Sequence, residues 1–554
     1  MAKGLDVDML EMTLDAIGEF AARELPDARL IELDEQDEFP ADLVRRMCSE
    51  ELGIQLLFID EEYGGMGGGA FDIARVCDRM ATVDVGVATA VLATFLGSDP
   101  ISVGGTGDQR KHWMTRLADE GLLMAYGATE PEAGSDLAAL KTTATPVMDD
   151  GRVVAYMLNG KKQWISNGGV ADLYTVLALA PGGPSWFVVD RDTDGFTHGK
   201  HEDKHGIRLS NTAALFIDDV RVDAERLVGG VEGQGLMQAQ QVFGYTRLMV
   251  AAFGLGAGWD ALDRAIPYSQ DRIQAGGPLS EKQGYTHKLV VPHVVRLETA
   301  RAVTEETAAR LDGGEESLNT EGAIAKYLAS EAGNGAADAA IQALGGYGYT
   351  HEYLVEKIKR DVRITTIYEG TSEIMEMTIG RDRWQFHLKT RGGHYHDQAR
   401  SLESLHATSP TVGADVAALA HHALAEVLEC CRVGRLTRHQ HVLLRIGELV
   451  AMVEGAGAAV RRAAQAAAGE LHAKADRRFD ALGAAAIARV SAREALAKTV
   501  ADGVRWTAGA DGDVAALVAT VDLAALARAQ AGLVSDMDLI ADLVYGRTPT
   551  GGAA

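Results

Sequence analysis

The chain has 554 residues, 47% of them hydrophobic and 24% charged, which is enough for two to four soluble domains with sizeable cores. A formal net charge of −26 argues against a general binder of nucleic-acid backbones, but it leaves room for a local basic pocket that holds a phosphorylated ligand. The chain has no run of roughly 18–20 uninterrupted apolar residues and no secretory signal pattern, and its four cysteines have neither disulfide nor zinc spacing. We therefore expect a cytoplasmic protein without a metal site.

Residues 1–125 carry mostly helical signals. Apolar residues recur at helical spacing in 9–24 and 41–53, and the stretch 70–97 predicts further helix. Between them, EEYGGMGGGA (61–70) is too rich in glycine for a helix or a strand and predicts a loop. This loop lacks the strand–GxGxxG–helix context of a dinucleotide-binding site.

The hydrophobic period changes to two between residues 126 and 235. VVAYMLNGKKQWIS (153–166) places Asn159-Gly160 between two alternating runs, which predicts a β-hairpin turn there. Further strands are predicted at 172–180, 185–192 and 212–222. The segment is predicted to be a small antiparallel β domain inserted between helical regions.

Helical periodicity returns after residue 235 and continues to the end of the chain. Three long helices are predicted at 235–266, 285–311 and 321–344, followed by a polar linker at 390–410 and alanine-rich helices such as 453–490. The fold class is therefore α+β and mainly α. Its predicted parts are an N-terminal helical domain (1–125), a middle antiparallel β domain (126–235), a C-terminal helical bundle (236–385) and an additional helical extension (386–554).

Four short stretches combine polar groups with glycine in ways that suit ligand binding. They are YGATEPEAGSDLAALKTTA (126–144), KKQWISNGG (161–169), QALGGYGYTHEY (342–353) and ITTIYEGTSEI (364–374). Each has a plainer explanation when taken alone: a capped loop, a core tryptophan, a common glycine turn, and an exposed glutamate near a helix start capped by Thr371 or Ser372. Their order and separations around a helix–β–helix layout carry more information than any one of them.

Together these stretches resemble the acyl-CoA dehydrogenase family of flavoproteins. The matching motifs are Tyr126 through Ala144, Trp164 through Gly168, Gln342 through Gly348 and Ile367 through Ile374, and 203–229 resembles the family's second β stretch. The resemblance covers about residues 5–385.

The resemblance implies an FAD held between the β domain and the C-terminal bundle. The implied cofactor contacts are Tyr126, Ala128, Thr129, Trp164, Ser166, Arg272, Gln283, Gln342, Gly346, Thr371 and Glu373. Among them, the Ser166 hydroxyl would lie near flavin N5. Arg272 and Gln283 would hold the pyrophosphate and adenine end across a subunit interface, which implies at least a homodimer. The implied substrate contacts are Ser135, Arg247, Tyr368 and Gly370.

Glu369 matches the catalytic base of the family. It would remove the α proton of an acyl thioester while hydride leaves the β carbon for flavin N5, giving the trans-2-enoyl-CoA. The backbone N–H of Glu369 and a ribityl hydroxyl would stabilise the charge on the thioester oxygen, and the neighbouring apolar run would form a dry slot. Some relatives place the base just before the arginine matched by Arg247, but the turn there is Gly244-Tyr245-Thr246, so Glu369 is the only strong candidate.

Several points stay open at this stage. Many family members carry an aromatic-glycine pair where this chain has Ala275-Gly276-Gly277, which leaves the adenine-side interface undefined. An electron-transferring flavoprotein is the expected acceptor; the alternatives are an acyl-CoA oxidase that uses O₂ and a DNA-associated flavoprotein of the same fold. We expect no nucleic-acid partner, and for the extension we favour subunit packing over membrane contact. The apolar stretch 82–97 carries no arginine, which disfavours recognition of a glutaryl-type acid there.

Overall fold

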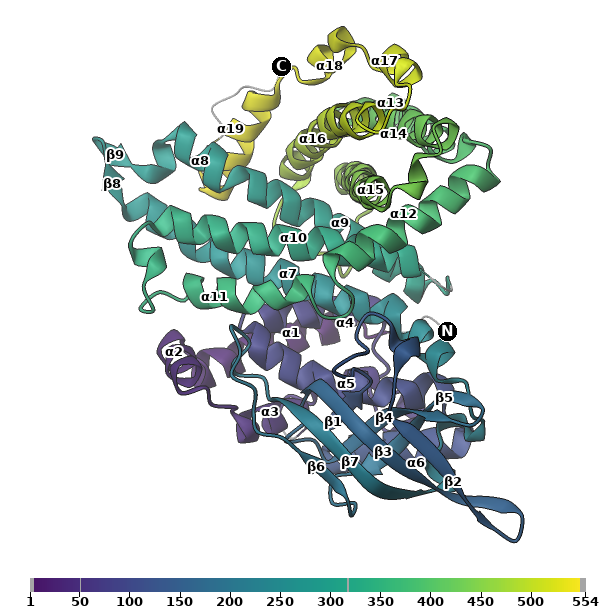
Figure 1. Cartoon of the computed structure of the whole chain (residues 1–554). Helices are drawn as coiled ribbons and strands as arrows, with labels where there is room; N and C mark the ends of the chain where they lie inside the picture. The colour runs from purple at the N-terminus through teal and green to yellow at the C-terminus, as the bar shows by residue number, and fades with distance from the viewer. Residues whose placement is uncertain (1–3, 50, 316–317, 549–554) are drawn as a thin grey trace. The chain divides into compact units, whose positions relative to one another are not determined.

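The computed structural model describes residues 4–49, 51–315 and 318–548, which fold into two compact units. Of the described residues, unit 1 comprises 4–49, 51–249, 311–315 and 360–364, and unit 2 comprises 250–310, 318–359 and 365–548. The division falls inside the long helix α7 (Gly235–Asp271) (Figure 1). The mainly helical α+β class is confirmed.

Unit 1 begins with helices and continues into a β-sheet. Its helices before the sheet are α1 (Val7–Glu24), α2 (Asp27–Gln36), α3 (Ala41–Cys48), α4 (Ala70–Ala81), α5 (Val85–Gly104) and α6 (Gly107–Glu120). The predicted loop at 61–70 contains a 3-10 turn, Glu61–Tyr63. Helix α5 starts where the Asp84 carboxylate accepts a hydrogen bond from the Val87 N–H (2.8 Å). It is the one described helix that could cross a membrane by length and composition, and 89% of that window is buried in the fold.

The sheet of unit 1 has the strand order β1-β4-β2-β3-β7-β6, and β5 pairs with β4. The strands are β1 (Met124–Gly127), β2 (Thr143–Asp149), β3 (Arg152–Ser166), β4 (Leu173–Ala180), β5 (Gly183–Asp190), β6 (Phe196–His198) and β7 (Thr212–Asp223). The β domain is confirmed, but its sheet is mixed: β1 and β2 run parallel to β4, and the other pairs are antiparallel. One face buries apolar side chains that include Leu158, Tyr174, Val176, Phe187 and Leu215.

The predicted hairpin turn at Asn159-Gly160 is wrong, because β3 continues through both residues. The register between β3 and β7 shifts at this point, so the pair forms a bulge. The Asn159 side chain bonds to Asp219 of β7, donating to the Asp219 carboxylate (3.0 Å) and accepting from its N–H (2.9 Å). A Cβ on Gly160 would lie 2.4 Å from the Thr142 Oγ1 atom, so the glycine is explained by a close approach of β2.

The true hairpin turn joins β2 to β3 through Asp150 and Gly151. Both residues have positive φ angles, 45° and 78°, as a tight two-residue hairpin turn requires. Asp-Gly is as strong a turn signal as Asn-Gly, so the choice between the two depended on which strand pairs with β7.

Unit 2 is helical. After α7 come the two-stranded hairpin of β8 (Ile273–Gln274) and β9 (Gly277–Pro278), and helices α8 (Gln283–Leu289), α9 (Val291–Asp312), α10 (Asn319–Leu344), α11 (Val355–Val362) and α12 (Ser372–Lys389). The predicted helix at 285–311 is divided at Val290, because Pro292 has no N–H to continue the helical ladder. Helices α7 and α10 approach closely where Gly254 faces Gly333: a Cβ on Gly333 would lie 2.2 Å from the Gly254 carbonyl oxygen.

The extension also belongs to unit 2. It consists of α13 (Gly393–Thr408), α14 (Ala414–Val433), α15 (Gln440–Ala468), α16 (Ala481–Ala508), α17 (Ala515–Thr520), α18 (Leu523–Ala529) and α19 (Leu533–Val544) (Figure 1). The linker predicted at 390–410 is wrong, since most of it is helix α13. Its buried residues Tyr395, Ala399 and Leu402 have the i, i+4, i+7 spacing of a helix face, which the polar composition of the stretch concealed.

Arginine–carboxylate pairs join the extension to the bundle. Arg383 of α12 binds Glu454 of α15 with two hydrogen bonds (2.7 and 2.9 Å), and the Tyr395 hydroxyl donates to the same carboxylate (2.7 Å). Arg445 of α15 donates from a single guanidinium nitrogen, Nη2, to both carboxylate oxygens of Glu376 of α12 (2.7 and 2.8 Å). Two more pairs, Arg461–Glu306 and Arg478–Asp263, connect α15 and the following loop to α9 and α7.

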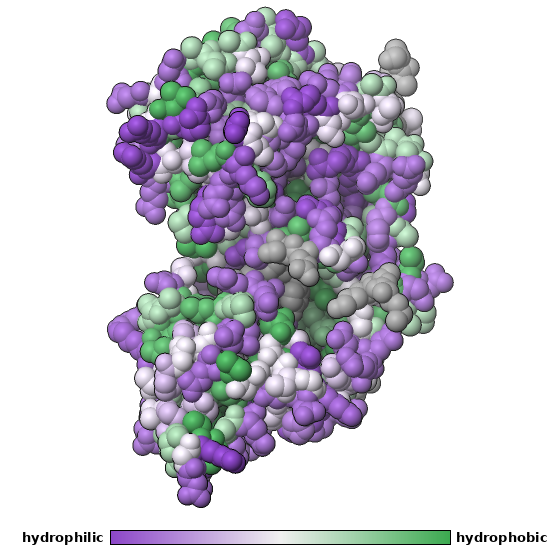
Figure 2. Space-filling model, turned by 90° about the vertical axis from the view of Figure 1, so that its right-hand side faces the viewer, coloured by the Kyte–Doolittle hydropathy of each residue, from purple (hydrophilic) through white to green (hydrophobic). Residues whose placement is uncertain are grey.

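Hydrophilic side chains predominate over the face drawn in Figure 2, as the large net negative charge of the chain implies. All four cysteines are free and buried. Among the described residues, no group of His, Cys, Asp and Glu side chains could hold a metal ion.

We expect unit 2 to lose stability on mild acidification, because His421 of α14 is buried in its neutral form. Burial lowers the pKa of His421 to about 4. In the unfolded chain its pKa is about 6.5, so the unfolded state binds more protons between these values and the free energy of unfolding falls as the pH drops. Between pH 7.5 and pH 5 this residue should account for a loss of about 2 kcal/mol, measured by urea unfolding.

The variant His421→Gln should show a shallower dependence on pH, whatever its stability at pH 7.5. Exposed His439 supplies the matched control, and His439→Gln should keep the full dependence. An unchanged slope in His421→Gln would contradict the assignment.

Candidate active site

Trp164 of unit 1 is exposed to solvent rather than packed in the core. It lies near the end of β3 with φ 62°, at a second register shift between β3 and β7, and 61% of its surface is exposed. Ile165 beside it is buried, whereas Ser166 is half-buried, so Trp164 and Ser166 lie away from the sheet core. An exposed indole next to a hydroxyl can stack on a flat ring and bond to its polar edge.

Tyr126 lies in β1, the loop after β1 carries Ala128 and Thr129, and a buried ion pair connects this loop to β3. The Lys162 ammonium, which is fully buried, donates to the Glu130 carboxylate (2.7 Å) and to the Ala128 carbonyl oxygen (3.2 Å). Burial lowers the pKa of Lys162 to about 8, although Glu130 acts in the opposite direction. Lys162 lies two residues before Trp164 in the sequence, and its hydrogen bond fixes the backbone at Ala128.

The same loop is closed by backbone contacts. The Glu130 carboxylate also accepts the N–H groups of Lys141 (2.6 Å) and Thr142 (3.0 Å), and the Gln163 N–H donates to the Thr129 carbonyl oxygen (3.0 Å). Ser135 lies exposed at the tip of this loop, and Asp136 caps the short 3-10 turn that follows it. Arg247 is buried on α7.

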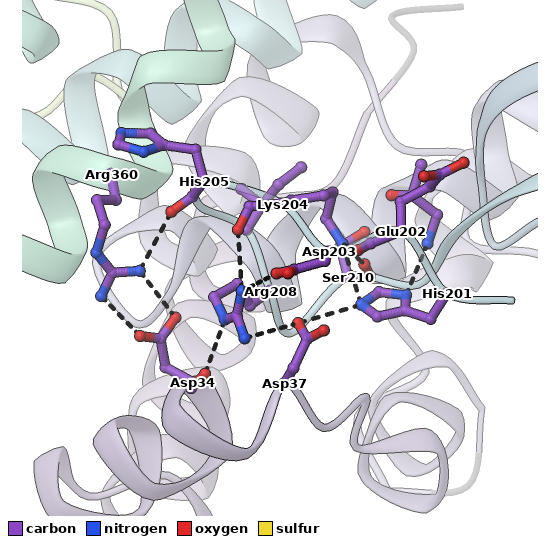
Figure 3. A network of polar contacts seen from close by, with 12 residues as sticks. Asp34, Asp37, His201, Glu202, Asp203, Lys204, His205, Arg208, Ser210 and Arg360 are labelled. Atoms are coloured by element: carbon purple, nitrogen blue, oxygen red, sulfur yellow. Dashed lines mark hydrogen bonds and ion pairs between the residues drawn. The ribbon is translucent and has the colours of Figure 1, made fainter.

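A network of ion pairs and hydrogen bonds connects α2, the loop 199–211 and Arg360 of unit 1 (Figure 3). Arg360 binds the Asp34 carboxylate through two nitrogens (2.6 and 3.2 Å), and Arg208 donates to the Asp34 carbonyl oxygen (2.9 Å) and the Asp203 carboxylate (2.7 Å). These contacts fix the loop 199–211 against α2. Glu202 of this loop accepts a hydrogen bond from Gln163 (2.9 Å), the residue before Trp164.

Glu369 of unit 2 lies in a turn with an unusual backbone. Its φ is 53° and that of Gly370 is 92°, so two consecutive residues are left-handed. A left-handed conformation in a residue other than glycine is strained, and such strain persists only where the surroundings hold it. Thr371 then caps α12, its hydroxyl accepting from the Ile374 N–H (3.3 Å), and Glu373 lies exposed in the first turn.

One face of α10 holds this turn. The buried Lys326 ammonium donates to the Gly370 carbonyl oxygen (2.6 Å), and the Ser330 hydroxyl donates to the Thr365 carbonyl oxygen (3.1 Å). The Ser372 hydroxyl donates to Glu331 on the next position of α10 (2.6 Å). Sequence reasoning did not identify Lys326 or Ser330, although polar residues four apart on an alanine-rich helix are a signal that could have found them.

The apolar run before Glu369 is only partly buried. Thr365 and Thr366 are buried, Tyr368 is half-buried, and Ile367 is 46% exposed. A dry slot formed by Ile367 is therefore not present in unit 2 itself.

The other predicted cofactor residues of unit 2 gather at the far end of α10. Arg272 and Gln283 are exposed on either side of the β8–β9 hairpin, and Gln342 and Gly346 are exposed at the end of α10. The Tyr285 hydroxyl donates to the Ala343 carbonyl oxygen (3.1 Å), which joins α8 to this end of the helix. A Cβ on Gly345 or Gly346 would meet nothing within 4 Å, so the backbone there is open to a ligand.

The Glu369 turn and the predicted cofactor residues at the far end of α10 lie far apart in unit 2. Lys326, which holds the Glu369 turn, and Gln342 are separated by about 24 Å along the α10 axis at the normal rise of an α-helix. If the residues at the far end of α10 bind a pyrophosphate, the Glu369 turn is too far away to contact that same pyrophosphate. The Glu369 turn can then contact only the flavin end of a cofactor.

These residues fit FAD. The exposed Trp164 ring and Ser166 hydroxyl suit a flavin ring, and the exposed Arg272 and open glycine backbone suit a pyrophosphate.

The fold and these residues define a flavin-dependent oxidoreductase, and the chain belongs to the acyl-CoA dehydrogenase family. It matches that family's N-terminal domain over residues 8–121, its middle domain over 125–220 and its C-terminal domain over 233–383. The protein is accordingly an FAD-dependent oxidoreductase that acts on acyl-CoA.

Its relatives include cyclohex-1-ene-1-carbonyl-CoA dehydrogenase of Geobacter metallireducens, 35% identical over 377 residues, which are 67% of this chain and 97% of the relative. The structure of butyryl-CoA dehydrogenase from Megasphaera elsdenii is 36% identical, covers 69% of this chain and 99% of its own, and has a TM-score of 0.64. An acyl-CoA dehydrogenase of Bacillus anthracis in complex with FAD is 24% identical and has a TM-score of 0.80. It covers 97% of this chain and 95% of its own, so the fold of the extension is shared.

We predict that Lys326→Met lowers acyl-CoA-dependent flavin reduction by about 10–100-fold, because the turn that carries Glu369 loses its fixed position. Flavin content should stay near normal, since the variant leaves the Trp164 and Arg272 groups unchanged. Stopped-flow absorbance of the flavin measures the rate. Lys359→Met is the matched control: it removes another ammonium that donates to an α10 carbonyl oxygen, that of Asn334 (3.0 Å), and should have little effect. Equal rates in both variants would contradict the role of Lys326.

Proposed function

We propose that Glu369 is the base that removes the α proton of an acyl-CoA, and that the product is the trans-2-enoyl-CoA. The observation that carries this proposal is the strained, left-handed turn at Glu369, which α10 holds through Lys326 and Ser330. Strain of this kind collects at functional sites.

Each of the predicted site residues would have a separate role in the reaction. Glu369 takes the proton, and its own backbone N–H is available to a thioester oxygen on which charge develops. Trp164 and Ser166 would fix the flavin ring, with the serine hydroxyl at its polar edge, while Tyr126, Ala128 and Thr129 line the same side. Bound FAD accepts the hydride from the β carbon. Tyr368, Gly370, Ser135 and Arg247 would contact the acyl-CoA.

We further propose that the protein is a homodimer or a higher oligomer in which Arg272, Gln283, Gln342 and Gly346 bind the FAD of a second subunit. The separation of about 24 Å along α10 supports this, because the ribityl chain of one FAD is too short to span it. Thr371 and Glu373, next to Glu369, would contact the cofactor of their own subunit.

The acceptor of the electrons is proposed to be an electron-transferring flavoprotein in the cytoplasm. The arginines of the extension favour this over a DNA-associated role, since Arg461 and Arg478 bind carboxylates of the bundle rather than standing free. The substrate is proposed to have an apolar acyl group, because α5 presents no cation among its residues.

An anaerobic titration of the holoenzyme tests the proposal. Acyl-CoAs that differ in length, branching and terminal charge are added while the visible flavin spectrum is recorded. Bleaching by one class identifies the substrate group, and a flavin that responds to none of them would contradict the reaction. Hydrogen peroxide released in air at the turnover rate would indicate an oxidase instead.

The variant Glu369→Gln should lower turnover by roughly 10²–10⁴-fold, since the amide cannot accept the proton. It is nearly isosteric, so FAD content and the binding of substrate should be retained. Glu470→Gln is the control: it changes an exposed carboxylate in the loop between α15 and α16 and should leave proton removal intact. Near-normal turnover in Glu369→Gln would exclude this residue as the base.

A further inference from the structure

The last helix of the extension, α19, lies against the part of unit 2 that carries Arg272 and Gln283 (Figure 1). This part, here called the 269–287 segment, runs from the end of α7 through the β8–β9 hairpin into α8. Three separate contacts connect α19 and the residues after it to this segment. Sequence comparison with short family members could not reveal them, because those members end before the extension.

The first contact is the Asp538 carboxylate of α19. One of its oxygens accepts a hydrogen bond from the Gln283 side chain (2.9 Å) and lies 3.1 Å from Nε2 of His287. A carboxylate only accepts, so the Gln283 amide must turn its NH₂ group toward Asp538. The side-chain oxygen of Gln283 is thereby directed away from Asp538 and can accept a hydrogen bond from a ligand.

The second contact is buried. The hydroxyls of Tyr545 and Ser269 are 2.9 Å apart, Ser269 is fully buried and Tyr545 is 6% exposed. Ser269 lies three residues before Arg272, at the end of α7. This hydrogen bond therefore fixes the point from which the Arg272 backbone leaves the helix.

The third contact holds the other side of the hairpin. The Arg547 guanidinium donates to the Ser280 carbonyl oxygen (2.9 Å) and to Asp542 of α19 (2.9 Å). Helix α19 is itself fixed to the body of the extension, because Asp536 binds Arg489 and Arg493 of α16. A continuous set of contacts thus leads from α16 to both sides of the hairpin.

We propose that α19 is a positioning element of the cofactor site: Asp538 orients the Gln283 amide and Tyr545 fixes the base of Arg272 for the adenine and pyrophosphate end of FAD. This assigns to the extension a part in holding the cofactor. It rests on the proposed cofactor role of Arg272 and Gln283, but not on the role of Glu369 in the reaction.

The rate of FAD release from the holoenzyme tests the proposal without any substrate. The enzyme is diluted and the recovery of free flavin fluorescence is followed over time. We expect Asp538→Ala and Tyr545→Phe each to speed release by about tenfold, the usual effect of losing one hydrogen bond. Asp538→Asn should release FAD within about threefold of the wild-type rate, because its side-chain oxygen can still accept from Gln283.

Two further measurements separate positioning from folding. Glu470→Gln, an exposed carboxylate in the loop between α15 and α16, should leave release unchanged. The thermal midpoint of each FAD-free protein reports packing alone. Lower thermal midpoints in the α19 variants with unchanged FAD release would overturn the proposal. Slower FAD release in both Asp538 variants would also overturn it, because Asp538 would then be a charge that repels the phosphates.

The outcome also separates this inference from its premise. Arg272→Ala should release FAD faster if the segment binds the cofactor at all. If it does not, the proposed cofactor role of Arg272 has failed. If Arg272→Ala releases FAD faster and the α19 variants do not, only the role of α19 has failed.

Discussion

The contact between α10 and the turn at residues 365–372 is the constraint on which the position of the proposed base depends. Two consecutive left-handed residues, Glu369 and Gly370, would relax to an ordinary turn if nothing opposed it. Lys326, Ser330 and Glu331 of α10 oppose it, with a buried ammonium on the Gly370 carbonyl oxygen. A buried ammonium is costly without partners, and the Gly370 carbonyl oxygen is one of the groups that offset the cost of burying Lys326. The position of the proposed base is therefore built into the bundle.

The extension is part of the same body, not an appendage. Arg383 and Tyr395 converge on Glu454, which is largely buried, and these contacts hold the pKa of Glu454 at about 2 in spite of its burial. Removing either partner would leave a buried charge unsatisfied, so α12 and α15 are expected to fold together. At the other end of unit 2, α19 reaches the segment with Arg272 and Gln283. The proposed positioning role of α19 would give the extension a part in fixing these residues.

The sequence was a good guide wherever one local property decided the structure. Helical periodicity located α1, α7 and α10, and the change to period two located the sheet. It failed where two local signals competed: Asn159-Gly160 and Asp150-Gly151 are both turn sequences, and only the pairing of β3 with β7 decides which of them turns. It failed again at 390–410, where polar composition outweighed the spacing of Tyr395, Ala399 and Leu402.

The sequence by itself determined the family, the mainly helical α+β fold, and Glu369 as the candidate base, because motif order and hydrophobic period are properties of the chain alone. Only the tertiary structure decided that Trp164 is exposed, that Glu369 is left-handed, and that Lys326, Lys162 and Asp538 support the proposed cofactor and catalytic residues. These features arise from contacts between residues tens to hundreds of positions apart. Such contacts leave no local pattern in the sequence, because the identity of a lysine does not show whether the fold buries it.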